Sequence, residues 1–338
     1  MTRSPPRTLA LLAVVLLAAA ALALLVGLQG WPSESILRLR LARAELAIIV
    51  GAGLACTGTV LQALSGNPLA DPFVIGASSG AAVGVVVARW CGVELTSRWL
   101  PLFTVVGAYA AIVLVLRIAR AGGRTPVQTL LLAGVTVSTL GTAIVLLYYN
   151  FQTGTGDAGR TMLFLMGNLS ESKPELIGLA AGCVALCIAA AGLSARALDA
   201  FAAGESTARH LGVDVERCKL GFCLLSAALV GVVVAVAGMI GFVGLIVPHA
   251  ARALVGHSHR RLIAASALGG ATFLLLADLA ARTVAIPREL SVGAITALCG
   301  GPFFLLLLRR RVRERDALSR ELGAGATGDR DRREEAPR

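Results

Sequence analysis

Apolar runs long enough to cross a lipid bilayer recur along this chain, and they constrain its fold more than any other feature. A helix needs about 17 to 25 mainly apolar residues to cross the hydrocarbon core. Runs such as Leu9 to Leu28 and Ala44 to Leu64 meet that length. Only 15% of the 338 residues are charged, against about a quarter in an average soluble domain. The sequence therefore excludes a soluble protein and predicts an integral membrane protein with several spans.

Glycine, proline and clusters of charge divide the apolar runs into about ten segments of helical length. The predicted fold class is an all-α polytopic membrane protein, and the first run is interpreted as an uncleaved span rather than a signal peptide. The eighth span is short and contains Pro248, so we expect a re-entrant or broken helix there. The ten predicted spans cover residues 8–28, 44–64, 73–90, 99–118, 127–149, 174–195, 219–238, 242–255, 262–284 and 291–308.

The arginines between and after the apolar runs predict the orientation. Ten spans place both termini on one side of the membrane, and five arginines crowd positions 309–315 directly after the last run. The positive-inside rule then puts both termini in the cytoplasm of a bacterium, with the protein in its inner membrane. The net charge of +11 is spread over loops and the C-terminus, so membrane lipid is an expected partner and nucleic acid is not. Residues 1–312 are predicted to form the transmembrane domain and residues 313–338 a disordered cytoplasmic tail.

Motifs typical of enzymes occur only as isolated matches. Gly154, Gly156 and Gly159 fit GxGxxG, but no strand precedes them and a loop between spans is predicted there. Residues 76–80 fit GxSxG within a helical segment, without a His and an Asp in a fixed relation to the serine. No GxxxxGK[ST] motif occurs. We therefore expect neither a catalytic site nor an ATP site in this chain.

Candidate metal ligands do not form a convincing set. His249 follows a proline, and His257 and His259 lie in a short predicted loop beside two arginines that would repel a cation. The seven cysteines are scattered and odd in number, which gives no disulfide framework. We expect no metal site and no cofactor.

The densest local signal is the glycine-rich stretch from Gly51 to Gly84. Residues 65–68 break the second span and predict a tight cytoplasmic turn. Asp71 then fits the N-cap of the third span, with Pro72 at its first helical position. Glycines repeat every four residues along that span and predict the close approach of another helix. The predicted turn and packing residues are Asn67, Pro68, Asp71, Pro72, Gly76, Gly80 and Gly84.

A short helical pattern lies between the sixth and seventh spans. It begins at Glu205 and ends near Arg209, so its charges complement the helix dipole. Gly204 precedes it, and Gly212 follows it as a helix-ending residue. The pattern predicts a short helix on the cytoplasmic side.

The later spans carry few charges. Asp278 and Arg282 are four residues apart in the ninth span, which allows an intramembrane ion pair on one helix face. Asp278 is almost the only acid within a span, which disfavours a secondary transporter driven by an ion gradient, because such transporters use ionisable residues at mid-membrane. Five arginines lie on the predicted outer side, against the positive-inside rule, namely Arg38, Arg40, Arg43, Arg282 and Arg288.

Several motifs follow one another between residues 38 and 310. They include NPLADP at Asn67 to Pro72, GASSGA at Gly76 to Ala81, LMGNLS at Leu165 to Ser170, GESTARHLGV at Gly204 to Val213, IGFVGLIVPHAAR at Ile240 to Arg252 and LLLADLAAR at Leu274 to Arg282. In this order they resemble the permease family of iron-siderophore, haem and cobalamin importers, the FecCD/BtuC-type permeases of type II ABC importers. The sequence departs from the family where RLAR, at Arg40 to Arg43, lacks the proline of the usual RLPR.

The resemblance implies two permease subunits, as a homodimer or a heterodimer, with two cytoplasmic ATP-binding subunits and an extracytoplasmic substrate-binding protein. The chain would be the membrane-spanning permease, and ATP hydrolysis would belong to the partner. Residues 204–212 would be the coupling helix that docks on the ATP-binding subunit. Outer arginines would receive carboxylates of the binding protein: Arg40, Arg43 and Arg282, with Arg288 beside them. The expected cargo is a ferric siderophore, with haem or cobalamin as alternatives.

Overall fold

The computed structural model describes residues 5–26, 34–68, 70–120, 125–152, 156–170, 174–286, 288–306 and 309. Within these residues the chain is helical and has no β-strand, which confirms the all-α prediction. The chain divides into two units, Met1–Ala297 and Leu298–Arg338, and every site discussed below lies in the first. The predicted tail, residues 313–338, lies outside the described residues.

Seven of the described helices are long and apolar enough to cross a membrane: α1 (Pro5–Leu25), α2 (Glu34–Ser65), α4 (Leu100–Ala119), α5 (Val127–Phe151), α7 (Pro174–Leu193), α10 (Val215–Ala237) and α12 (His259–Thr283). The three remaining predicted spans correspond to shorter helices, namely α3 (Ala77–Trp90), α11 (Val243–Val255) and Val292–Leu306. Three further short helices are α6 (Gly156–Leu165), α8 (Ala195–Ala202) and α9 (Glu205–His210). Each predicted span therefore coincides with a helix.

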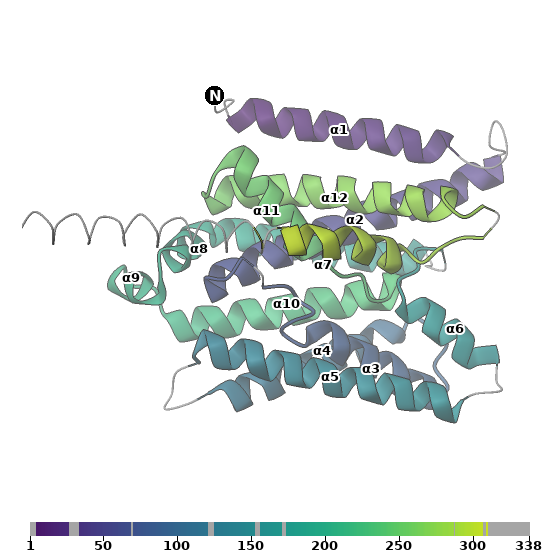
Figure 1. Ribbon diagram of the computed structural model, residues 1–338, viewed down its shortest axis with the longest axis horizontal. Coiled ribbons are helices and arrows are strands. Elements are labelled where there is room, and N and C mark those ends of the chain that lie inside the picture. Colours follow the sequence, from purple (N-terminus) through teal and green to yellow (C-terminus); the bar gives the residue numbers. More distant parts are fainter. Residues whose placement is uncertain are drawn as a thin grey trace, which may run out of the picture. The chain divides into compact units, whose positions relative to one another are not determined.

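The long helices of the first unit run side by side, and short helices lie at both ends of the bundle (Figure 1). α8 and α9 lie at the end where α1 begins, and α6 lies at the opposite end. α2 runs through the middle and packs most extensively on α12, while α4 packs on α3 and α10. The two ends of the bundle thus carry different structures, which matters for the sites described below.

Helix α2 begins ten residues before the predicted start at residue 44, at Glu34. Arg40 and Arg43 therefore lie on the helix and not in an outer loop, so the predicted boundary is wrong. The early turns contain good helix formers, and Glu34 pairs with Arg38 at 2.6 Å, four residues along. The apolar run marks only the part of α2 that suits the hydrocarbon. The helix itself continues into the charged residues before that run.

The role predicted for Asp71 is also wrong. Helix α3 begins at Ala77, and its N-cap is Gly76. Gly76 has a φ of 91°, in the left-handed region that glycine adopts readily. Asp71 instead lies in the turn before the helix, where its Oδ1 accepts a hydrogen bond from the Phe73 N–H at 2.9 Å. The side chain thus stabilises a turn of its own backbone rather than a helix terminus.

The break expected at Pro248 does not occur, because α11 continues through this residue. A proline inside a helix leaves the carbonyl four residues earlier without its usual donor. That carbonyl belongs to Gly244, and it accepts a hydrogen bond from Gln62 Nε2 of α2 at 2.9 Å. A side chain of a neighbouring helix therefore replaces the missing backbone donor.

The segment expected to be an outer loop, around Gly156 and Gly159, forms helix α6. Gly154 of the apparent GxGxxG match lies outside the described residues. Asp157 occupies the first turn of α6, where an acidic side chain favours the helix dipole. The helix has only 10 residues and two glycines, and so it lacks the long apolar pattern by which the other helices were predicted.

Glycines bring the central helices into backbone contact. A Cβ atom on Gly51 of α2 would overlap the carbonyl oxygen of Gly270 in α12. One on Gly58 would overlap the backbone of Gly244 in α11. Such contacts let helices approach closely where lipid gives no hydrophobic drive for association.

Two of the three glycines in the predicted stripe face α4. Gly80 lies against the Gly107 backbone and Gly84 against the Phe103 backbone, so neither has space for a side chain. Gly76, the third, serves as the left-handed N-cap of α3 described above. Of the three glycines at four-residue spacing, only the two that lie within α3 therefore contact α4.

The contact at Gly51 predicts a stability difference between two glycine variants. Gly51→Ala places a methyl group in filled space, and overpacking of this kind costs about 1 to 3 kcal/mol. Gly182→Ala in α7 is the matched control, because no heavy atom lies within 4 Å of the added Cβ. We expect the purified Gly51 variant to melt at a lower temperature in detergent than the parent, and the Gly182 variant to melt at the same or a higher temperature. Equal melting temperatures of the two variants would contradict the packing account.

Candidate functional site

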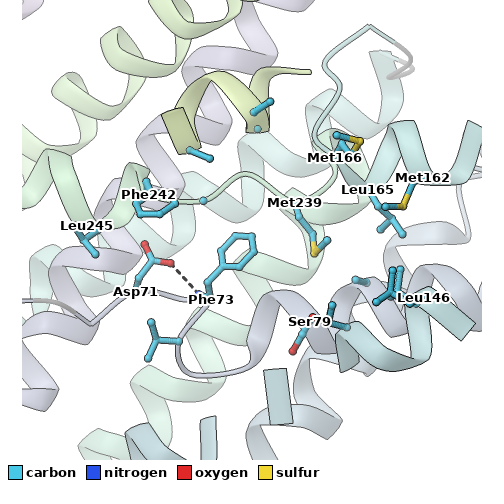
Figure 2. Close-up of a pocket in the computed structure, with 18 residues that line it drawn as sticks. Asp71, Phe73, Ser79, Leu146, Met162, Leu165, Met166, Met239, Phe242 and Leu245 are labelled. Carbon is cyan, nitrogen blue, oxygen red and sulfur yellow. Dashed lines mark hydrogen bonds between the residues drawn. The ribbon is translucent and has the colours of Figure 1, made fainter. Parts of the chain in front are cut away.

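A cavity of about 500 Å³ lies in the first unit, between the turn before α3, helices α5 and α6, and the segment before α11 (Figure 2). Its volume is in the range of cavities that hold small organic ligands. Its polar side chains are Asp71, Ser79 and Thr142, and the other lining residues are apolar or glycine. The apolar lining includes Phe73, Val74, Ala82, Val145, Leu146, Met162, Leu165, Met166, Met239, Phe242, Leu245, Ala294 and Ala297.

One wall of the cavity is built from irregular backbone that is cross-connected by hydrogen bonds. The Asn168 N–H donates to the Ala237 carbonyl at 2.9 Å, and the Met239 N–H donates to the Leu165 carbonyl at 3.2 Å. The Val292 N–H donates to the Gly167 carbonyl at 3.1 Å. These bonds join the end of α6, the end of α10 and the start of the last helix. The wall is thus fixed although its backbone is not helical.

Phe242 introduces local strain at the cavity. Its φ is 67°, and it is the single non-glycine residue with positive φ among those described. A bulky residue in this region is an outlier that persists only where the surroundings impose it. Phe242 is the N-cap of α11, and its side chain has no polar group that could cap the helix.

Asp71 lies beside Phe242 and Phe73 (Figure 2). Asp71 is 5% exposed. It takes part in none of the ion pairs found among the described residues. Its Oδ2 faces Gly244 in the first turn of α11, where the helix dipole favours a negative charge. The cavity therefore contains one acidic group held at a helix N-terminus.

A cluster of four charged residues lies where α2 and α12 meet, at the end of the bundle opposite α9. Arg43 Nε donates to Asp278 Oδ1 at 2.6 Å, and Arg43 Nη1 donates to Glu289 Oε2 at 2.8 Å. Arg282 Nε lies 3.1 Å from Asp278 Oδ2, which is the pair predicted from the four-residue spacing. The Asp278 side chain is fully buried. A buried carboxylate needs such partners because its desolvation is costly.

Two of the predicted docking arginines also hold the end of α1. Arg40 Nη1 donates to the Leu24 carbonyl at 2.7 Å, and Arg282 Nη2 donates to the Ala23 carbonyl at 3.2 Å. Cations and carbonyl acceptors suit each other at a helix C-terminus. Arg40, Arg43 and Arg282 are therefore engaged within the chain, as the four-residue spacing predicted for Arg282, and their docking role stays a prediction. Arg288 is exposed.

Helix α9 coincides with the predicted short helix, and Gly204 and Gly212 flank it with positive φ. Glu205 pairs with Lys219 of α10 at 2.5 Å. Lys219 also donates to the Thr125 carbonyl at 2.9 Å, so this buried ammonium connects three segments. The sequence gives no local signal for this role of Lys219, because only the fold brings it beside Glu205.

The exposed part of α9 lies away from the Lys219 pair. Ser206 and His210 are exposed, and Arg209 lies 3.5 Å from Glu216 while keeping much of its side chain exposed. Leu211 directly follows the helix and is 68% exposed. This surface presents a mixture of polar and apolar groups at the end of the bundle.

His259 is not in a loop, as predicted, but is the first residue of α12. Asp199 of α8 accepts a hydrogen bond from its backbone N–H at 2.8 Å and lies 2.7 Å from its ring Nδ1. The carboxylate thus satisfies an orphan donor at the start of α12 and connects that helix to α8.

Comparison with known proteins places these sites in a family. Residues 7–310 match the FecCD transport family. The hemin transport system permease protein HmuU of Yersinia pestis is 39% identical over 286 residues, covering 82% of this chain and 84% of that protein. The cobalamin import system permease protein BtuC of Halobacterium salinarum is 44% identical over 274 residues, covering 81% and 73%. An inward-facing metal-chelate type ABC transporter superposes with a TM-score of 0.82 at 32% identity, covering 90% of this chain and 99% of that chain.

The charge cluster at Asp278 predicts a large difference between two acid variants. Asp278→Asn leaves Arg43 and Arg282 without their buried counter-ion, and breaking a buried pair costs about 3 to 5 kcal/mol. Glu34→Gln is the control, because Glu34 and Arg38 form a mostly exposed pair, worth at most about 1 kcal/mol. We expect a marked fall in melting temperature for the Asp278 variant and little change for the Glu34 variant. An unchanged melting temperature for Asp278→Asn would show that the cluster does not stabilise the fold.

Proposed function

Because this chain belongs to the FecCD transport family and is an ABC importer permease, we propose that it carries a metal-containing macrocycle of the haem or cobalamin kind inward through the cavity described above. Relatives named as hemin and cobalamin permeases support this cargo class. The observation that carries the proposal is the lining of the cavity, which has three polar side chains among eighteen residues.

The lining distinguishes between the two cargo classes. A ferric siderophore presents many oxygen groups that hydrogen-bond to water, and burying them without partners is costly. A porphyrin or corrin presents a broad apolar face that suits Phe73, Phe242 and the apolar side chains around them. The ferric siderophore expected from the sequence stays the alternative.

We place a second permease subunit, identical or related, against the face of α5. Several leucines of this helix are exposed in the single chain, including Leu146, which also lines the cavity. An exposed apolar face beside a ligand cavity fits an interface that completes a central path. Two cytoplasmic ATP-binding subunits would supply the energy, and both termini would lie on their side of the membrane.

The extracytoplasmic binding protein would dock at the end of the bundle that holds the arginine cluster. Arg288 is exposed there and would be accessible to carboxylates of a partner, and Arg38 is exposed although it pairs with Glu34 at 2.6 Å. Arg43 is the poorest docking residue of the predicted set, because its side chain is 11% exposed and already contacts two carboxylates. Reversing its charge would disturb folding as well as docking.

The coupling role of α9 predicts that Leu211→Asp lowers uptake and the amount of ATP-binding subunit that co-purifies. The substitution replaces the exposed apolar side chain of Leu211 and leaves the Glu205–Lys219 pair unchanged. Glu205→Arg is a poorer test, because it would leave Lys219 facing a second cation. Arg217→Asp is the control, because Arg217 is 89% exposed and lies in the first turn of α10, whereas Leu211 is the C-cap of α9. Normal co-purification and uptake with Leu211→Asp would remove α9 from the coupling surface.

The cargo proposal predicts the nutrient that a strain lacking this chain can no longer import. Such a strain should regain uptake of haemin or of cyanocobalamin when the parent chain is restored, and uptake of a ferric trihydroxamate chelate should not depend on the chain. ATP-driven uptake should persist when a protonophore collapses the ion gradient, which separates the importer from a secondary transporter. If only uptake of the trihydroxamate depends on the chain, the result would favour a ferric siderophore as the cargo.

A further inference from the structure

The distribution of methionine in this chain is uneven. The sequence contains four methionines, one of which is Met1. The other three, Met162, Met166 and Met239, all line the cavity. No internal methionine is used anywhere else in the chain.

None of these three side chains is fully buried in the core, although Met239 packs against the core with part of its side chain. Methionine usually fills irregular gaps in a packed interior, yet none of the three is buried, and Met166 is 44% exposed. Figure 2 shows Met162 and Met166 on one side of the cavity, with Met239 and Phe73 between them and Phe242. All three side chains thus line the cavity that Phe73 and Phe242 also line, and Met239 in addition packs against the core.

Two of the methionines lie at the C-terminal end of α6, Met162 in its last turn and Met166 directly after it. The Met166 N–H donates to the Met162 carbonyl at 2.9 Å, so the side chains are one helical turn apart and lie on the same side. Met239 joins them because its N–H bonds to the Leu165 carbonyl. A fixed backbone thus presents three flexible side chains to one space.

Glycines keep this backbone fixed. A Cβ atom on Gly238, which precedes Met239, would overlap the Phe164 carbonyl oxygen, and one on Gly293 would overlap the Met166 carbonyl oxygen. The methionine backbone therefore cannot shift easily to fit a ligand. Adaptation to a ligand is left to the unbranched side chains, which have three rotatable bonds each.

We propose that Met162, Met166 and Met239 form a thioether wall that contacts the conjugated face of the transported macrocycle and sets the specificity of the path. The proposal rests on the cargo class proposed above. Sulfur contacts aromatic rings favourably and is polarizable, whereas a leucine of similar volume offers neither property nor the same freedom to adapt. A polar trihydroxamate chelate gains nothing from such a wall.

Methionine oxidation provides a direct test. Gallium(III) protoporphyrin IX, a redox-inactive macrocycle, is added to the full-length chain in lipid nanodiscs, and dilute peroxide is applied. Sulfoxide formation at each methionine is measured by mass spectrometry, with Met1 reporting the peroxide dose. We expect the macrocycle to slow oxidation of the three cavity methionines severalfold relative to Met1, and a gallium trihydroxamate chelate to have no such effect.

Two variants complete the design. Leu163→Met adds a methionine to α6 at an exposed residue that does not line the cavity, so its oxidation should not change with the macrocycle. The triple change of Met162, Met166 and Met239 to Leu keeps the volume and removes the sulfur. We expect it to weaken macrocycle binding about tenfold, measured by fluorescence quenching, because three sulfur contacts of ordinary strength are lost.

The outcomes separate this proposal from the cargo proposal. Absent protection of the three methionines, or unchanged affinity of the triple variant, overturns the thioether wall if cells still import the macrocycle through this chain. Protection by the trihydroxamate and not by the macrocycle also overturns it. Cells that show no chain-dependent macrocycle uptake would instead refute the proposed cargo.

Discussion

Backbone hydrogen bonding inside an apolar bundle is the constraint on which the rest of this structure depends. A helix satisfies its own polar groups, but irregular backbone away from water must find other partners. Here side chains of neighbouring helices supply such partners. Gln62 donates to the Gly244 carbonyl, which Pro248 leaves without its usual donor in α11, and Ser138 of α5 donates to the Phe73 carbonyl in the turn before α3 at 2.8 Å. The cavity lies where these segments meet, because covered irregular backbone leaves space that packed helices would fill.

The two ends of the bundle are stabilised by different interactions. At one end, buried charges connect α1, α2 and α12 through Arg43, Asp278 and Arg282. At the other end, the Glu205–Lys219 pair and the contact of Asp199 with His259 hold short helices against long ones. Glycine contacts hold the middle, where Gly51 meets Gly270. The ion pairs thus gather near the two ends, whereas Asp71 lies in the cavity and the middle depends on close packing.

The sequence predicted the features that depend on local pattern. Apolar runs gave the ten spans, and a four-residue spacing gave the pairing of Asp278 with Arg282. Contacts between distant residues could not be read in this way. Arg43 and Asp278 are 235 positions apart, and Lys219 is one charge among many until the fold places it beside Glu205. The start of α2 was missed because hydropathy shows which residues suit the membrane and not where the helix begins. The cavity was missed because its walls come from five separated segments.

Helix α10 connects the two regions of the molecule that differ most. Its first turns are fastened to α9 through Lys219, and its last residue is followed directly by Gly238 and Met239 in the cavity wall. A helix of 23 residues is about 35 Å long and stiff along its axis. If α9 receives the ATP-binding subunit, as proposed, a force on it would not have to be relayed from residue to residue through the bundle. It would reach the other end as the displacement of one stiff helix, and the two hydrogen bonds that join Ala237 and Met239 to the segment at the end of α6 would be strained first.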